Sequence, residues 1–170
     1  MSVKSNRSHA APFEIERGFK APLDRVWGAW SEADQIHHWW GPKGCSIELG
    51  RFEFRPGGFF HYAMNFAGAP PMWGRFNYRE IVPRERIVWL NSFSNAACGI
   101  TRAPFSELCP LEIENCVTFK EQAGVTTIQL RAQPFGETAE ERPYFEDLRE
   151  SLQEGYGGTY ERLTDYLARR

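Results

Sequence analysis

The segment RPYFEDLRESLQEGYGGTYERLTDYLARR, residues 142–170, determines the architecture we expect. Its apolar residues recur mostly at intervals of three and four, which is typical of an amphipathic helix packed on a sheet. Three glycines, Gly155, Gly157 and Gly158, lie in the middle of that helix. Because each glycine in a helix interior costs about 1 kcal/mol relative to alanine, we expect a sheet or a ligand to come very close to the helix backbone there.

Upstream of this helix, apolar and polar residues alternate as they do in half-buried strands. The alternation predicts strands over residues 13–19, 45–54, 60–66, 73–81, 86–93, 111–119 and 125–132. A one-residue phase shift at Gly50 indicates a β-bulge. Helical spacing predicts two short helices over residues 23–30 and 32–39, the second ending at Trp40-Gly41-Pro42 because a residue before proline avoids the helical region.

This order of elements predicts an α+β fold, in which a curved antiparallel sheet of about six or seven strands wraps around a long C-terminal helix. Residues 1–12 are polar and predict a flexible N-terminal tail, and residues 13–170 predict a single domain. A sheet so rich in aromatic residues can curve far enough to leave a pocket between its concave face and the helix.

Composition excludes several classes of function. The 170 residues carry a formal net charge of -2 and include no run of lysines or arginines, so nucleic acid is not an expected partner. No stretch is long and apolar enough for a membrane span and no signal peptide is recognisable, which predicts a cytoplasmic protein. The four cysteines form no C-x-x-C pair, so we expect neither a metal site nor a cofactor.

Several ordered motifs resemble those of a known family. They are FKAP (19–22), VW (26–27) with Trp30, WWGP (39–42), RPGG (55–58), IVPRERIV (81–88) and EGY (154–156) with Leu163. Together they resemble the activator-of-heat-shock-ATPase-homologue branch of the START-like (SRPBCC, Bet v allergen-like) superfamily. The resemblance implies a helix-grip fold with a deep hydrophobic cavity, which the superfamily uses for lipids, sterols, polyketides and plant hormones. Tyr156 stands where the family usually carries tryptophan, which implies a differently shaped pocket.

The candidate ligand-binding residues are those that the predicted strands and helix direct toward a shared interior. They are Trp40, Phe60, Tyr62, Met64, Phe76, Tyr78, Trp89, Asn91, Phe93, Asn115, Leu152, Gly155 and Tyr156. Asn91 and Asn115 interrupt otherwise apolar faces, so each either bonds a neighbouring backbone group or a trapped water, or anchors a ligand hydroxyl or carbonyl. Arg17 on the first strand either anchors a ligand carboxylate or extends to solvent.

Other polar residues give weaker signals. Adjacent helix residues point about 100° apart, so His37 and His38 do not readily share a metal ion. We expect both to be exposed; the functional alternative places one of them at the pocket mouth near Trp40. His61 alternates with Phe60 and Tyr62 and is expected outside the cavity. The long loop over residues 94–110 predicts a lid, a cover for a sheet edge or an oligomer contact.

The sequence favours a protein that binds a small hydrophobic ligand, lipid-like or polycyclic, between the sheet and the C-terminal helix. No catalytic constellation is recognisable, because the chain has no nucleophile elbow, glycine-rich nucleotide loop or P-loop. Two alternatives remain open. One is an interaction protein of the stress response that contacts a chaperone and stimulates its ATPase, and the other is a cyclase or hydrolase acting in the same cavity. A monomer and a homodimer are equally compatible with the sequence.

Overall fold

The structure, a computed structural model, describes residues 10–136 and 138–169. One antiparallel sheet runs in the order β1-β8-β7-β5-β4-β3-β2, with the short β6 paired to β5 beside this path. The strands are β1 (Phe13–Phe19), β2 (Cys45–Phe52), β3 (Phe59–Phe66), β4 (Met72–Val82), β5 (Arg86–Ser94), β6 (Ile100–Thr101), β7 (Ile113–Gln122) and β8 (Val125–Pro134). The predicted curled sheet is confirmed, and its strands begin and end within a few residues of the predicted bounds.

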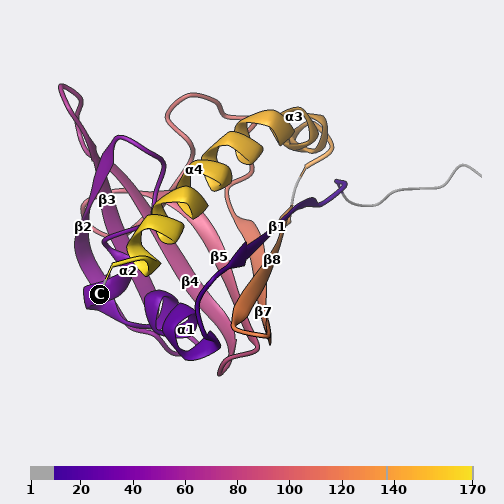
Figure 1. The fold of residues 1–170 in the computed structure, drawn as a ribbon. Helices are drawn as coiled ribbons and strands as arrows, with labels where there is room; N and C mark the ends of the chain where they lie inside the picture. The colour runs from indigo at the N-terminus through magenta and orange to yellow at the C-terminus, as the bar shows by residue number, and fades with distance from the viewer. Residues whose placement is uncertain (1–9, 137, 170) are drawn as a thin grey trace, which may run out of the picture.

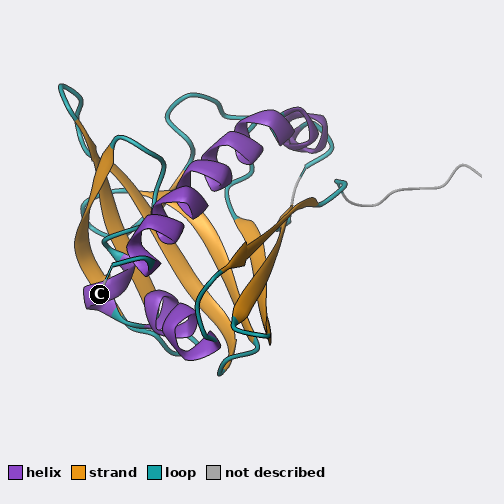
Figure 2. Cartoon of the chain, in the orientation of Figure 1, coloured by secondary structure: helices purple, strands orange, loops and turns teal. Residues whose placement is uncertain are grey.

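Four helices accompany the sheet in the described part of the chain: α1 (Leu23–Ser31), α2 (Ala33–Ile36), α3 (Glu141–Asp147) and α4 (Arg149–Leu167). Helix α4 lies across the concave face of the sheet, and α1 and α2 lie near its C-terminal end (Figure 1; Figure 2). This is the helix-grip arrangement that the sequence predicts.

Two helix boundaries differ from the prediction. The expected helix over residues 32–39 is only one turn long, because the chain passes through turns before Gly41, whose φ of +95° no helix accommodates. The expected C-terminal helix is divided at Leu148, whose ψ of -1° departs from helical geometry and whose amide bonds the Phe145 carbonyl. Its predicted last residue, Arg170, lies outside the described residues.

Of the two expected neighbours of the helix glycines, a sheet or a ligand, the close approach of the sheet is wrong. A Cβ on Gly155 would meet no atom of the described chain within 4 Å, and on Gly157 and Gly158 the nearest atoms would be 3.8 and 3.6 Å away, which are ordinary van der Waals distances. The tight approach is instead inside the sheet, where a Cβ on Gly74 would lie 2.6 Å from the Tyr62 hydroxyl oxygen. The low helix propensity of these three positions is therefore not offset by a close backbone contact within residues 10–136 and 138–169.

Two irregularities bend the sheet. The register between β2 and β3 shifts between Leu49 and Arg51, which confirms the bulge predicted at Gly50, and the register between β4 and β5 shifts between Tyr78 and Glu80. Bulges increase local twist and bend a strand. Both therefore help the sheet to curve around α4.

One end of the interior is filled by aromatic rings. Trp89 stacks on Phe76 with ring centroids 4.7 Å apart, and Trp30 contacts Trp39 at 4.8 Å. Ring pairs at these separations contribute about 0.5–1.5 kcal/mol beyond the burial of their area. This end of the grip is a packed core.

Packing begins before the first strand. Ala10 is 4% exposed, and the Ala11 amide donates a hydrogen bond to Glu146. Contacts with the domain thus start three residues before Phe13, where the predicted tail ends; residues 1–9 of that tail lie outside the described residues.

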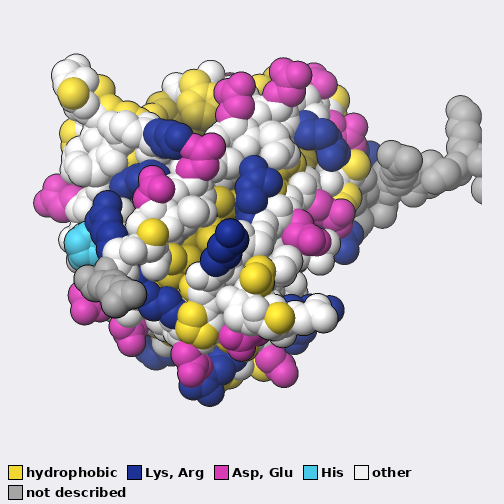
Figure 3. All heavy atoms as spheres, in the orientation of Figure 1, with side chains coloured by type: hydrophobic (Ala, Val, Ile, Leu, Met, Phe, Trp, Pro, Cys, Tyr) yellow, Lys and Arg dark blue, Asp and Glu magenta, His cyan; other side chains and the backbone are white. Residues whose placement is uncertain are grey.

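Charged groups of both signs are interspersed on the face seen in Figure 3, with no large area of one sign. Within residues 10–136 and 138–169, no helix has the length and hydropathy needed to cross a membrane.

Candidate functional site

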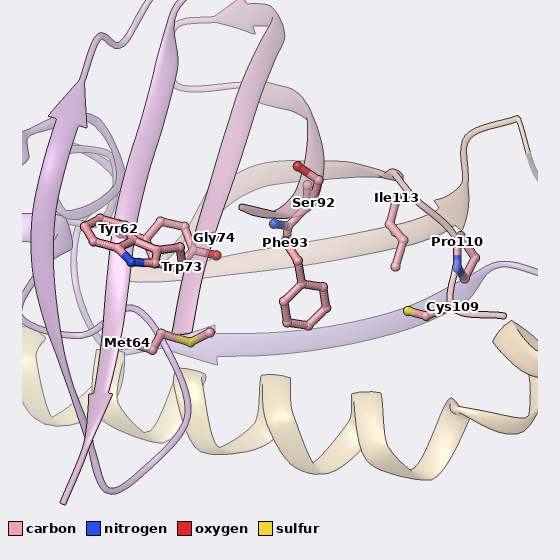
Figure 4. Close-up of a pocket in the computed structure, with 10 residues that line it drawn as sticks. Tyr62, Met64, Trp73, Gly74, Ser92, Phe93, Cys109, Pro110 and Ile113 are labelled. Carbon is pink, nitrogen blue, oxygen red and sulfur yellow. The ribbon is translucent and has the colours of Figure 1, made fainter. Parts of the chain in front are cut away.

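Two pockets lie side by side at the end of the grip that the aromatic core leaves open. The first, here called the sheet pocket, has a volume of about 150 Å³ and is shown in Figure 4. It is lined by Tyr62, Met64, Trp73, Gly74, Asn91, Ser92, Phe93, Cys109, Pro110 and Ile113. The second, here called the helix pocket, has a volume of about 210 Å³. It is lined by Trp40, Gly41, Pro42, Tyr62, Met64, Asn91, Ser151, Leu152, Gly155, Tyr156 and Thr159.

Tyr62, Met64 and Asn91 line both pockets and therefore form their shared wall. In Figure 4 the Met64 and Phe93 side chains point from the sheet toward helix α4. An unbranched thioether has three rotatable bonds and adapts readily to its surroundings. Met64 is thus the part of the wall that can move with the least disturbance.

Strand pairing explains how the shared wall is built. Tyr62 on β3 is directly opposite Gly74 on β4, and Gly74 is opposite Phe93 on β5. Since Gly74 has no Cβ, the Tyr62 ring can lie flat across β4, at a distance that alanine would not permit. Gly74 thus allows the Tyr62 ring to take its place in the wall of the pocket.

The Tyr62 phenol is the most enclosed polar group of the wall, and only 4% of the residue is exposed. Burial raises the pKa of Tyr62, while hydrogen bonds from the Trp40 and Asn91 side chains oppose that shift. The Asn91 Nδ2 atom also donates to the Arg75 carbonyl across 3.2 Å. Tyr62 is therefore a neutral phenol held in place by two neighbours.

Asn115 is fully buried and satisfied within the protein. Its Oδ1 atom accepts a hydrogen bond of 2.7 Å from the Tyr156 hydroxyl, and its Nδ2 atom donates to the Ile113 carbonyl. The Tyr156 ring also stacks on Phe13 with centroids 5.8 Å apart. Asn115 lines neither pocket, and it positions Tyr156, which does.

The remaining predicted site residues divide into two groups. Trp40, Phe93, Leu152 and Gly155 line one of the pockets, whereas Phe60, Phe76, Tyr78 and Trp89 belong to the packed core and line neither. Arg17 is exposed, with its guanidinium beside Gly157, and does not line either pocket.

Sequence reasoning misses several lining residues. Cys109, Pro110 and Ile113 come from the end of the long loop and the start of β7, and Ser151 and Thr159 are polar residues of α4. For Pro110, the sequence feature that could have drawn attention to the residue is its place as a proline directly before a predicted strand. Nothing in the alternation pattern identifies the loop residues, because loops have no period.

The loop over residues 94–112 is attached to helix α3 by one arginine. The Arg102 Nη1 atom donates to the Cys109 carbonyl and to Glu141, whose side chain is only 7% exposed. The loop also contains β6, which pairs with the end of β5. These contacts hold Cys109 and Pro110 against the sheet pocket.

Arg162 of helix α4 holds the segment that borders the helix pocket. Its Nη1 atom donates to the carbonyls of Trp40, Gly41 and Pro42 at distances of 2.9 to 3.1 Å. Because carbonyls that converge on one cation are held in a fixed arrangement, Arg162 sets the position of the segment that forms the mouth of the helix pocket.

The histidines of the described chain line neither pocket. The rings of His37 and His38 are in contact on the surface, with centroids 4.0 Å apart. His61 is buried on the other side of its strand, where it stacks on Trp73 and contacts the Asn95 carbonyl across 2.9 Å. Among the described residues, no group of three or more His, Cys, Asp or Glu side chains is arranged to hold a metal ion.

Comparison with known structures gives the same fold. A protein from Arthrobacter aurescens is 23% identical, with a TM-score of 0.76 over 94% of this chain and 87% of its own. A protein from Mycobacterium smegmatis is 20% identical, with a TM-score of 0.75 over 100% and 98% of the two chains. The AHSA1 protein from Silicibacter pomeroyi is 16% identical, with a TM-score of 0.67 over 93% and 98%.

No curated protein matches the sequence significantly. The sequence does match the family described as Activator of Hsp90 ATPase homolog 1-like protein, over residues 20–168. That range includes every strand except the first and all four helices of the described structure. The chain therefore belongs to the Activator of Hsp90 ATPase homolog 1-like family, and its fold is of the START-like type.

Proposed function

We propose that this protein binds a small, largely apolar molecule in the sheet and helix pockets. The observation that carries the proposal is a pair of adjoining pockets that share Tyr62, Met64 and Asn91. Helix α4 lines the helix pocket, and the end of the long loop lines the sheet pocket. Mostly apolar walls with a few convergent polar groups are the usual composition of a small-molecule site.

The volumes of the two pockets limit the size of the ligand. Volumes of about 150 and 210 Å³ are each below the roughly 300–1,000 Å³ that a drug-sized ligand occupies. A ligand of one or two rings fits, and a larger one requires Met64 to move so that the pockets join. Burying about 250 Å² of apolar ligand surface would contribute about 6 kcal/mol before association costs, so we expect micromolar to millimolar dissociation constants.

The proposal is tested by titrating ¹⁵N-labelled protein with 2-acetylnaphthalene and recording amide chemical shifts. Saturable shifts are expected at Met64, Asn91 and Leu152. A Leu152→Trp variant fills the helix pocket and is expected to weaken binding at least about tenfold, because the indole occupies the ligand's space.

The matched control is Leu111→Trp, which adds the same ring at an exposed position that lines neither pocket. It is expected to bind as the natural protein does. Absence of saturable binding by the folded natural protein, or equal binding by both variants, would contradict the proposal.

A second candidate function is contact with a chaperone ATPase, for which the family is described. The observation that favours it is the exposed apolar surface of the long loop, where Phe105 is 60%, Leu108 47% and Ile100 41% exposed. Large exposed apolar side chains grouped on one loop are typical of protein-contact surfaces. The test is chaperone ATP turnover with added protein, in which Phe105→Ser should abolish any stimulation.

A further inference from the structure

The charge of the ligand can be inferred from what lines the pockets. Among the described residues that line either pocket, none is a lysine, arginine, histidine, aspartate or glutamate. The polar groups that do line them are the hydroxyls of tyrosine, serine and threonine, one amide, one thiol and the indole N–H groups. The lining of both pockets therefore consists of groups that are uncharged at neutral pH.

The titratable groups of the walls are neutral near pH 7, and burial favours their neutral forms further. Burial raises the pKa of the Tyr62 phenol and of the Cys109 thiol. Burial also raises the pKa of the Tyr156 phenol. None of the three supplies an anion or a cation near pH 7.

Three arginines that contact the segments around the pockets are engaged with other groups. The Arg162 guanidinium donates to three backbone carbonyls, and Arg102 is paired with Glu141. Arg75 donates to the Cys98 carbonyl and lies over the Phe59 ring at 4.2 Å. A ligand carboxylate in the pockets would therefore lose its hydration without gaining a cationic partner from the described lining, which is unfavourable.

The shared wall does offer hydrogen bonds. The Tyr62 hydroxyl and the Asn91 amide lie together where the two pockets meet, and they bond each other. A neutral carbonyl or hydroxyl placed there can join this pair. A hydrocarbon cannot, and a charged group finds no counter-ion among the described lining residues.

We infer that the site takes an uncharged molecule with a hydrogen-bonding oxygen at the Tyr62–Asn91 wall, and that it discriminates against the carboxylate of the same shape. This inference rests on the proposed function. It also replaces the expectation that Arg17 could anchor a ligand carboxylate, since that arginine is exposed and lines neither pocket.

Three probes with one ring system separate the possibilities: 2-acetylnaphthalene, 2-ethylnaphthalene and 2-naphthoate. At about pH 7.5 the ketone is expected to bind the natural protein at least about tenfold more tightly than the carboxylate, and several-fold more tightly than the hydrocarbon. Tyr62→Phe and Asn91→Leu should each reduce the ketone's affinity toward that of the hydrocarbon. The second variant serves if the first does not fold.

Each contrary outcome is distinct. Equal or tighter binding of the carboxylate would overturn the inference while leaving the proposed function in place. Equal binding of ketone and hydrocarbon would overturn the role of the oxygen. Failure of all three probes to bind the folded protein would overturn the proposed function itself.

Discussion

The hydroxyl of Tyr156 on α4 donates a hydrogen bond to the Oδ1 atom of Asn115 on β7 across 2.7 Å. Asn115 has no exposed surface, so water cannot replace this partner without rearrangement. The bond ties the first half of the helix to the middle of the sheet. The bond is therefore a structural contact between helix and sheet. By fixing the position of the Tyr156 ring, it also shapes the helix pocket.

Removing the Tyr156 hydroxyl should destabilise the protein. Tyr156→Phe leaves the buried Asn115 oxygen unpaired, which we expect to lower the free energy of unfolding by about 1–3 kcal/mol. The double variant Tyr156→Phe with Asn115→Leu should be more stable than the sum of the single effects predicts, by at least about 0.5 kcal/mol. Urea unfolding of the four proteins measures this coupling. Strict additivity would show that the bond contributes nothing.

Alanine at the helix glycines should stabilise the fold. A Cβ added to Gly155 would have no atom of the described chain within 4 Å, and one added to Gly157 would make only an ordinary contact. Each change to alanine should therefore raise the free energy of unfolding by up to about 1 kcal/mol, measured by urea unfolding. Destabilisation by either alanine would contradict the geometry of this helix.

The same two substitutions differ in their effect on binding. Gly155 lines the helix pocket and Gly157 does not. Gly155→Ala should weaken binding of 2-acetylnaphthalene, because its methyl group enters the pocket, whereas Gly157→Ala should leave binding unchanged. Amide chemical-shift titration of the two variants checks this difference, and equal affinities would place the ligand away from Gly155.

Replacing Arg162 should loosen the mouth of the helix pocket. Arg162→Met keeps the aliphatic stem and removes the donors to the carbonyls of Trp40, Gly41 and Pro42. We expect a lower thermal midpoint and weaker probe binding, because the thioether cannot donate to these carbonyls. Arg149→Met, on an exposed residue of the same helix, is the control and should change neither quantity. Equal effects of the two variants would argue against the fixing role of Arg162.

Acid should destabilise the protein partly through His38. Burial lowers the pKa of His38, with His37 and Arg169 adding to the effect and Asp34 opposing it. As pH falls, His38 is therefore protonated in the unfolded chain before it is protonated in the folded protein. The free energy of unfolding should fall as pH drops from the usual histidine pKa of about 6.5 toward the lower folded pKa, and this loss should be absent at pH values above about 6.5. His38→Gln should flatten this part of the stability profile measured by urea unfolding. A profile unchanged by the substitution would refute the assignment.

Much of the fold follows from periodicity. Strand β1 coincides residue for residue with the predicted strand, and the bulge at Gly50 is visible as a change of phase, because alternation in a half-buried sheet is imposed by the pleat. The break at Leu148 cannot be predicted in this way, since the amphipathic pattern continues through it. The glycines of α4 do not mark a close approach of the sheet, because a low helix propensity shows that a residue is unfavourable without identifying what lies next to it.

The candidate site is predicted only in part. Alternation correctly directs Tyr62 and Met64 toward the interior with Phe60 and Phe76, but it cannot say which inward side chains touch one another and which leave a gap. Whether a gap remains depends on the combined side-chain volumes of residues on paired strands that are distant in sequence. Gly74 and Tyr62, which are opposite each other on β4 and β3, are an example. The gap also depends on the loop residue Cys109, whose placement rests on the Arg102 contacts rather than on any pattern.

The strand order ends at β1 on one side and β2 on the other, and α4 rather than a hydrogen-bonded ladder crosses the interval between them. A closed β-barrel has a fixed diameter, because widening it would break backbone hydrogen bonds between its strands. An open sheet that is closed by a helix can widen when the helix tilts, because only side-chain contacts are then lost. Two contacts of α4 oppose such a tilt, namely the Tyr156 hydrogen bond to Asn115 and the Arg162 hydrogen bond to the Trp40 carbonyl.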